Sequence, residues 1–347
     1  MRWLATIGVL LAAGLCRAAD EVPIRLAWPP ANAEYSVTFL DSVSTPRDLR
    51  IRRGFFSKLV RVVAGPSKRR RSLLRPFFIA VDREGRLLIT DRAGPAVHIL
   101  DPRRKKYKRL DGARKERFRS PIDVDTDARG NIYVTDSDRG KIFVFRKNGK
   151  FDRFIGDAGG EGLYKRPTGI AIDKTSGRIY LTDTLRHAVE VIDAAGRPLE
   201  RWGERGEGPG EFNFPTDIAL APDRVFVLDA MNFRVQVFDR KGAFLTSFGK
   251  PVNEPGGLFR PKGIAVDEGR KLVYVVDAMF ELVQAFTYDG ELVWAFGHGG
   301  TKPGEFFLPA GICVDPEGRL LVADSYNSRV QVFRPRPARS AGLVRRR

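Results

Sequence analysis

The chain of 347 residues contains few of the side chains from which disulfide scaffolds and metal centres are built. It has two cysteines, Cys16 and Cys313, and three histidines, His98, His187 and His298. So few cysteines exclude a disulfide-dense scaffold, and removal of Cys16 with a leader would leave Cys313 without an intrachain partner. The patterns G-x-S-x-G and H-E-x-x-H are absent, and the glycines serve turns rather than a phosphate-binding loop.

Long stretches with helical spacing of apolar residues are also missing. The sequence instead contains six copies of one pattern. Each copy has a proline, an apolar strand, a turn and a second strand that ends in Asp, followed by a third strand and a turn to a fourth. The terminal aspartates are spaced 45 to 48 residues apart, which is the period of a β-propeller blade. We therefore predict an all-β fold, a six-bladed β-propeller of four-stranded antiparallel blades over residues 76–333. The aspartates are Asp91, Asp136, Asp183, Asp229, Asp277 and Asp324.

The sixth repeat lacks a fourth strand. After Phe333 the chain enters RPRPARSAGLVRRR, whose prolines and charges do not form a strand pattern, and we expect residues 334–347 to be a basic disordered tail. The segment YSVTFL, Tyr35 to Leu40, precedes the first repeat and has no blade of its own. We predict that this N-terminal strand completes the last blade and closes the ring.

The residue pattern of these repeats resembles the NHL repeat. The pattern P-x-G-I-A-V-D, then G-x-(I/L)-Y-V-x-D, then N-x-R-V-Q-V-F is most complete in Pro215 to Phe238 and Pro309 to Phe333. It is degenerate in the first repeat, where Phe78 replaces the glycine. The resemblance implies a six-bladed propeller, but the superfamily includes protein-binding, RNA-binding and lyase members, so the fold does not fix the function.

The first 19 residues resemble a signal peptide, with Arg2, an uncharged run from Trp3 to Cys16 and small residues at Ala18 and Ala19. The run is shorter than the roughly 20 residues that span a bilayer. We therefore expect an exported protein, periplasmic or extracellular. A lipid anchor on Cys16 is disfavoured because Leu15 stands where a lipobox needs a small residue.

The formal net charge of +18 is concentrated in three segments. Residues 42–76, 102–120 and 334–347 carry net charges of +10, +8 and +6, so the remaining residues are net acidic by six. Export argues against nucleic acid and favours anionic polysaccharide, membrane phosphates or an acidic protein as partner of this basic seam; a solvated basic surface is the alternative. Within residues 20–75, the stripe Phe56, Leu59, Val60 and Val63 predicts a short helix in a basic linker.

The loops that join the second and third strands of each blade should converge with the loops between blades on one face, at the mouth of the central channel. Exposed Met, Phe, Tyr and Arg together are typical of protein-binding patches. Asn232, Arg234, Asn327 and Arg329 also repeat the NHL pattern and have bracing of the loops as their alternative role. The candidate binding residues are Arg92, Arg139, Arg186, His187, Met231, Asn232, Arg234, Met279, Phe280, Tyr326, Asn327 and Arg329.

The six terminal aspartates recur in every blade and are therefore predicted to accept backbone N–H bonds. Deviations between blades carry more information. Two residues after the proline, blades two and four have Asp123 and Asp217 where blades three, five and six have glycine, and Asp125 replaces a common alanine. Carboxylates on inner strands are possible ligands of a channel-bound Ca²⁺ or other divalent cation, although no EF-hand pattern is present.

From these patterns we infer a non-catalytic, monomeric propeller that binds an envelope protein or peptide through the channel-mouth loops. The alternative is a metal-dependent lyase or lactone hydrolase at the same mouth. NHL-like lyases of the peptide-amidating type use histidine-bound zinc, and His187 lies in a suitable loop, but convergence of all three histidines on one metal is not expected.

Overall fold

The computed structural model describes residues 27–28, 35–51, 72–113 and 116–337. The predicted signal peptide, the short helix of the basic linker and the last ten residues lie outside this part of the chain. In the described part, no helix is long and apolar enough to cross a membrane. Among the residues described, the secondary structure consists of β-strands with two 3-10 turns, η2 (Thr184–Arg186) and η3 (Ala230–Asn232).

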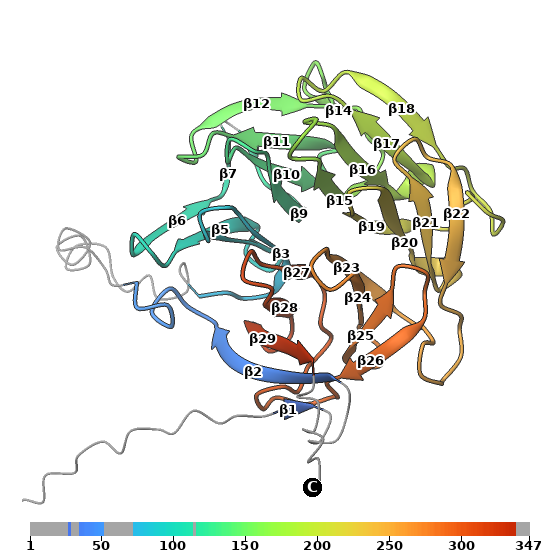
Figure 1. Cartoon of the computed structure of the whole chain (residues 1–347). Helices are drawn as coiled ribbons and strands as arrows, with labels where there is room; N and C mark the ends of the chain where they lie inside the picture. The colour runs from blue at the N-terminus through green and yellow to red at the C-terminus, as the bar shows by residue number, and fades with distance from the viewer. Residues whose placement is uncertain (1–26, 29–34, 52–71, 114–115, 338–347) are drawn as a thin grey trace, which may run out of the picture.

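Six antiparallel sheets are arranged in a ring around a central channel (Figure 1). Each terminal Asp closes the second strand, and the turn that follows returns the chain into the third strand, which is why the repeat of the sequence becomes a repeat of blades. The strands are, in blade 1, β3 (Pro76–Val81), β4 (Leu87–Asp91), β5 (Ala96–Asp101) and β6 (Lys106–Leu110); in blade 2, β9 (Pro121–Thr126), β10 (Ile132–Asp136), β11 (Lys141–Phe145) and β12 (Phe151–Ile155); in blade 3, β15 (Pro167–Ile172), β16 (Ile179–Asp183), β17 (Ala188–Ile192) and β18 (Pro198–Trp202); in blade 4, β19 (Pro215–Leu220), β20 (Arg224–Asp229), β21 (Arg234–Asp239) and β22 (Phe244–Phe248); in blade 5, β23 (Pro261–Asp267), β24 (Leu272–Asp277), β25 (Leu282–Thr287) and β26 (Leu292–Phe296).

The sixth blade is completed by the N-terminal strand, as predicted. It consists of β27 (Ile312–Val314), β28 (Leu320–Asp324), β29 (Arg329–Pro337) and β2 (Tyr35–Val43), with the short β1 (Ala27–Trp28) added outside β2. The pairing of β2 with β29 runs from Tyr35 opposite Pro337 to Val43 opposite Val330. The predicted end of the repeat domain at Phe333 was therefore four residues too early, because β2 offers a paired edge that the local prolines alone do not suggest.

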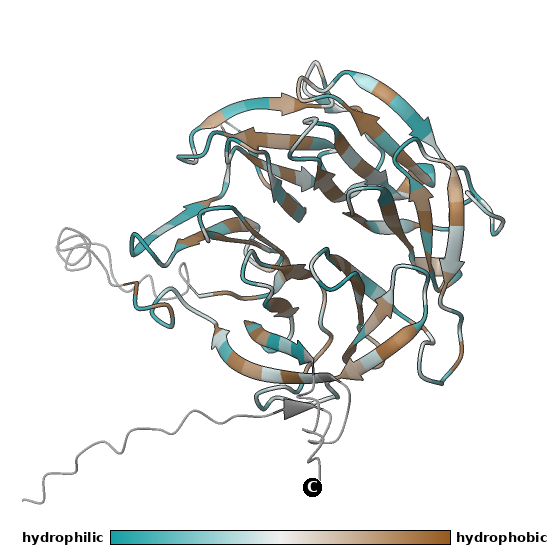
Figure 2. Cartoon of the chain, viewed as in Figure 1, coloured by the Kyte–Doolittle hydropathy of each residue, from teal (hydrophilic) through white to brown (hydrophobic). Residues whose placement is uncertain are grey.

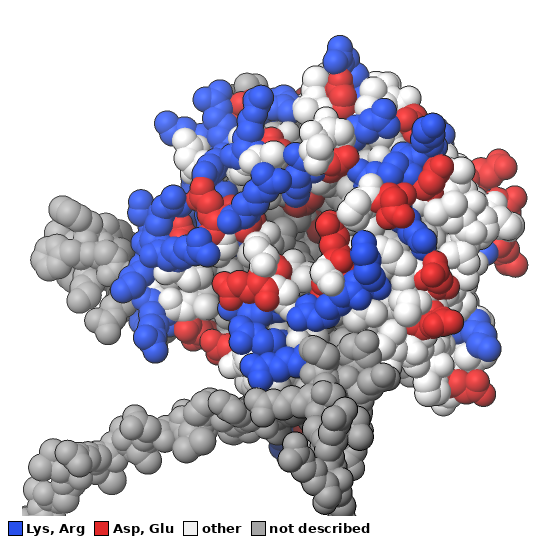
Figure 3. Space-filling view, in the orientation of Figure 1, with Lys and Arg blue, Asp and Glu red and all other residues white. Residues whose placement is uncertain are grey.

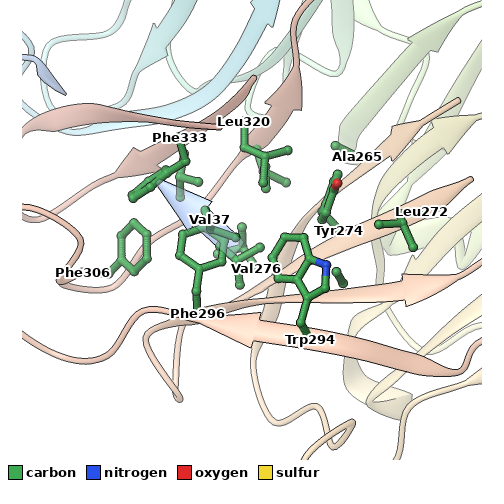
Figure 4. Close-up of a cluster of buried hydrophobic side chains, with 14 residues drawn as sticks. Val37, Ala265, Leu272, Tyr274, Val276, Trp294, Phe296, Phe306, Leu320 and Phe333 are labelled. Atoms are coloured by element: carbon green, nitrogen blue, oxygen red, sulfur yellow. The ribbon is translucent and has the colours of Figure 1, made fainter. Parts of the chain in front are cut away.

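The hydrophobic core is divided among the six interfaces between blades (Figure 2). Between blades 5 and 6, for example, Tyr274 and Trp294 lie beside Phe296, Phe333 and Val37 of the closing strand (Figure 4). Since each interface buries its own apolar cluster, the ring can grow beyond the size at which a single core stops growing. Two further strand pairs, β7 (Gly112–Ala113) with β8 (Glu116–Arg117) and β13 (Asp157–Ala158) with β14 (Glu161–Gly162), stiffen loops between blades.

The inner strands approach one another closely near their first residues. A Cβ added to Gly263 would lie 2.5 Å from the carbonyl oxygen of Ala310, and one added to Gly311 would lie 2.7 Å from the carbonyl oxygen of Phe77. These positions therefore leave no room for a side chain, which explains their glycines. The channel is narrow at this end and wider further along the inner strands.

Candidate functional site: the upper face

Two sets of loops form one face of the ring, which we call the upper face. One set joins the second and third strands of each blade, and the other joins the fourth strand to the first strand of the next blade. All six terminal aspartates hold these two sets together by accepting backbone N–H bonds, as predicted; Asp91, for example, accepts from Leu74 at 2.6 Å and from Arg75 at 3.1 Å. Burial raises the pKa of Asp136, Asp229 and Asp324, and the hydrogen bonds oppose this shift.

Four predicted binding residues are braces within these loops. Asn232 Nδ2 donates to Asp229 at 2.8 Å and to the Gly206 carbonyl at 2.9 Å, and Arg234 Nε donates to the same carboxylate at 2.9 Å. Asn327 and Arg329 repeat this arrangement on Asp324 in blade 6. Their donors are thus used inside the loops, which is the alternative role that the NHL pattern implies.

Three more predicted residues also bond within the loops. Arg139 donates to the carbonyl of Arg117 at 2.9 Å, and Arg186 donates to that of Leu163 at 2.6 Å. The His187 ring packs on Phe214 with centroids 4.7 Å apart, and its Nδ1 lies 3.2 Å from the Phe212 carbonyl oxygen. These side chains stabilise the loops rather than stand free for a partner.

The remaining predicted residues are available at the surface. Met231, Met279 and Tyr326 are 53%, 58% and 48% exposed, and Arg92 is also exposed. Phe280 is half-buried because its ring packs against that of Phe259, with centroids 5.5 Å apart.

Neighbouring loops add side chains that the sequence analysis did not select. Of the eleven large apolar side chains that are exposed in the described residues, eight lie in the loops of the upper face. They are Leu74, Leu163, Leu185, Met231, Phe259, Met279, Phe307 and Tyr326. The other three, Leu40, Leu199 and Leu245, lie on outer strands. Aligning the residues before each proline across the six repeats would have revealed Phe307 and Phe259.

The three carboxylates predicted as cation ligands are held by backbone groups. Asp123 accepts N–H bonds from Val124 at 2.7 Å and from Ile170 of the next blade at 2.8 Å. Asp217 does the same with Ile218 and Ile264, both at 2.8 Å. Asp125 accepts from Thr126, Ile172 and the Lys174 ammonium. All six oxygens therefore have donors, and in the described part of the chain no three His, Cys, Asp or Glu side chains are grouped to hold a metal ion.

The histidines are also separate. His98 is buried in β5, where its Nδ1 lies 3.0 Å from the Tyr107 hydroxyl, and burial lowers its pKa to about 4. The side chain of His298 is exposed, 3.6 Å from Glu305. Neither lies with His187 in a shared cluster of three ligands.

Among the cavities of the opposite, lower face, one lies in the channel and one contains a cluster of cations. One, of about 730 Å³, fills the wide part of the channel; its walls come from the inner strands of all six blades, including Ala80, Ala265 and Cys313, and it reaches the lower loops at Arg83 and Glu268. Burial raises the pKa of the Cys313 thiol. The other cavity, of about 870 Å³, is a groove between blades 1 and 2. Its cations are Arg86, Arg104, Lys105, Lys106, Lys108, Arg146 and Lys147.

Family models agree with this architecture. A model described as the NHL repeat matches residues 308–333, and one described as a 6-bladed beta-propeller matches residues 122–189 and 218–284. With its six blades in a ring, the chain is a six-bladed β-propeller, and residues 308–333 match the NHL repeat.

Curated relatives align with parts of the ring. Peptidyl-glycine alpha-amidating monooxygenase of Mus musculus is 26% identical over 135 residues, which cover 36% of this chain and 14% of the relative. The E3 ubiquitin-protein ligase NHLRC1 of Homo sapiens is 30% identical over 65 residues, covering 19% of this chain and 16% of the relative. The aligned segments thus represent a small part of each of these relatives.

Solved structures share the fold. Virginiamycin B lyase from Staphylococcus aureus matches with a TM-score of 0.56 and 15% identity, covering 87% of this chain and 99% of that one. An auxiliary nutrient binding protein from Bacteroides thetaiotaomicron matches with a TM-score of 0.59 and 14% identity, covering 76% and 69%. At these identities the likeness shows the fold alone, which serves both a lyase and a binding protein.

Proposed function

We propose that this propeller is an exported, periplasmic or extracellular, monomeric binding scaffold whose upper face holds a protein or peptide partner. The observation that carries the proposal is the concentration on that face of eight of the eleven large apolar side chains that are exposed in the described part of the chain. Scattered single apolar residues are normal on a protein surface, whereas their gathering on one face is typical of an interaction site.

The rigidity of the loops supports the same function. The terminal aspartates and the side chains bonded to them fix the backbone on which Met231, Met279 and Tyr326 stand. Preformed loops lose little conformational entropy on binding, so that more of the contact energy contributes to affinity.

The test compares two triple alanine variants in a quantitative pull-down from an envelope extract. Met231→Ala, Met279→Ala and Tyr326→Ala together should reduce capture of the bound protein at least tenfold, because buried anchors of this size commonly contribute about 2 kcal/mol or more. As the control, Leu40→Ala, Leu199→Ala and Leu245→Ala remove the three large apolar side chains that are exposed outside the upper face among the residues described. Equal capture by both variants and by the unchanged protein would contradict the proposal.

The alternative function is a metal-dependent lyase or lactone hydrolase. It is supported by the fold that this chain shares with virginiamycin B lyase. It requires stoichiometric Ca²⁺, zinc or another divalent metal in the purified protein and dependence of activity on His187, Asp123 or Asp217. Metal analysis by mass spectrometry distinguishes the two functions, since the binding scaffold needs none.

A further inference from the structure

Three cations from alternate blades converge at the centre of the upper face. Arg92 belongs to blade 1, Arg166 directly precedes blade 3, and Lys262 is the second residue of β23 in blade 5. Each is close enough to the others for their charges to interact: Arg166 acts on Arg92, and both act on Lys262. Since blades 1, 3 and 5 are not neighbours in the ring, these side chains meet across the mouth of the channel.

Two further arginines enlarge this group. Arg75 stacks over the Tyr326 ring at 4.7 Å from its centroid, and Arg260 acts on Lys262. We call Arg75, Arg92, Arg166, Arg260 and Lys262 the mouth cations. Lys262 is half-buried and the four arginines are exposed.

The mouth cations differ from most basic residues of the ring because none of them forms an ion pair with a described residue. The carboxylates of Asp138, which acts on Arg92, and of Asp277, which acts on Lys262, partly offset the repulsion without bonding to these side chains. Partial desolvation by the surrounding loops and the repulsion between these cations lower the pKa of Arg92, although its side chain reaches the surface, and of the half-buried Lys262.

The local sequence explains why the Arg92 side chain forms no hydrogen bond to the next blade. At the equivalent position in blades 2, 3 and 6, Ser137, Thr184 and Ser325 donate to the carbonyl of the proline that starts the next blade. Arg92 cannot reproduce this short bond, and its guanidinium instead stacks 4.8 Å from the centre of the Phe77 ring.

A second observation concerns an unpaired polar atom at the same level. Thr216 follows Pro215 in blade 4 as Lys262 follows Pro261 in blade 5, and its buried hydroxyl oxygen has no hydrogen-bond partner among the described residues. Buried polar atoms without a partner are rare and costly in native proteins.

We propose that the mouth cations select an acidic segment in the peptide or protein partner, with Glu or Asp carboxylates seated on Arg92, Arg166 and Lys262 and apolar side chains around them on Met231, Met279 and Tyr326. This inference rests on the proposed function. A neutral partner that covered the mouth would bury unpaired charges at high cost, whereas carboxylates pair with guanidinium groups in bidentate geometry.

The probes are two fluorescent octapeptides that alternate Leu with Glu or Leu with Gln, measured by anisotropy at physiological salt. The Glu peptide should bind about tenfold or more tightly than the Gln peptide. The double variant Arg166→Gln and Lys262→Gln should remove this preference while keeping the binding of the Gln peptide and the melting temperature.

The matched control is Lys105→Gln with Lys106→Gln, which removes the same charge from the groove on the lower face. A preference for Glu that survives Arg166→Gln and Lys262→Gln, or that vanishes in the control, overturns the inference. A competition experiment at neutral pH tests the other source of negative charge. If a heparin fragment displaces the labelled Glu peptide at a lower concentration than the unlabelled Glu peptide does, the inference is overturned in favour of an anionic polymer. The proposed function is tested separately by the triple alanine variant of Met231, Met279 and Tyr326. This variant should lose binding of both peptides, and unchanged binding of both would contradict the proposed function and not the selection of acidic residues.

Discussion

Asp217 lies on the inner strand of blade 4 at a position that blades 3, 5 and 6 fill with glycine. A Cβ at Gly169 would lie 2.6 Å from the Asp217 Cα, so the carboxylate occupies space that the neighbouring strand leaves open. It accepts N–H bonds from Ile218 and from Ile264 of the next blade. The side chain therefore joins two blades, and burial raises its pKa to about 8 despite the hydrogen bonds.

This shift predicts that stability decreases as pH rises towards 8. In the folded state Asp217 binds a proton up to about pH 8, whereas in the unfolded state the carboxyl is ionised above its ordinary value of 3.8. The folded state thus binds more protons between these values, and the unfolding free energy should fall by up to about 1.4 kcal/mol per pH unit. Urea unfolding between pH 6.5 and 8 measures this slope outside the window, pH 4 to 6.5, in which the lowered pKa of His98 has the opposite effect.

The variant Asp217→Asn should flatten the slope, because an amide does not titrate. Asp223→Asn, which changes a side chain that is 69% exposed, serves as the control and should leave the slope unchanged. Asp123, whose pKa burial and Asp217 both raise, contributes with the same sign and prevents a slope of zero. Identical slopes in the two variants would refute the assignment.

At the scale of the element, strand β2 supports more of the ring than the sequence pattern suggests. Val37 is buried in the core between blades 5 and 6, and Val43 is buried in the core between blades 6 and 1. A single strand therefore contributes to two of the six interfaces. Its partner β29 extends through Pro335 and Pro337, although proline has a low propensity for β-strands.

Shortening either partner should destabilise the protein. Ending the chain after Phe333 removes four residues that pair with β2, from Arg334 to Pro337, and should lower the melting temperature, whereas ending it after Pro337 should not. Deleting residues up to Val43 exposes the whole edge of β29 and should abolish cooperative unfolding in calorimetry. An unchanged transition after this deletion would show that blade 6 does not need the closing strand.

The blades could be predicted because each level of the sequence agrees: the proline, the alternation of apolar residues, the turn and the terminal Asp recur at one period. The upper-face residues were predicted only in part, because a repeated position does not reveal which donors are already used. Arg234 and Arg329 were candidate contacts and are braces. Arg166 and Lys262 lie close to Arg92 although the three residues are 74 residues or more apart along the chain. Such convergence depends on ring closure and is not encoded locally.

At the scale of the whole molecule, charged side chains are distributed unevenly around the ring. Lys and Arg crowd over blades 1 and 2, and acidic and basic side chains alternate over the rest of the visible face (Figure 3). The groove between these blades contains cations whose mutual repulsion is only partly offset: Glu84 binds Arg104 and Lys147, while Lys105 and Lys106 form no ion pair with a described residue. Burial and the charge of Lys150 lower the pKa of Lys108.

This distribution predicts salt-dependent retention on an anionic polysaccharide. Exposed charges are screened within about 10 Å at 0.1 M salt, so the protein should elute from immobilised heparin over a steep salt range, and Lys105→Gln with Lys106→Gln should elute at lower salt. Arg197→Gln with Arg201→Gln removes the same charge from blade 3, where both side chains pair with carboxylates, and should elute with the unchanged protein. Equal shifts in both variants would mean that net charge alone governs retention, and the groove would then have no role as a binding surface for anionic polymers.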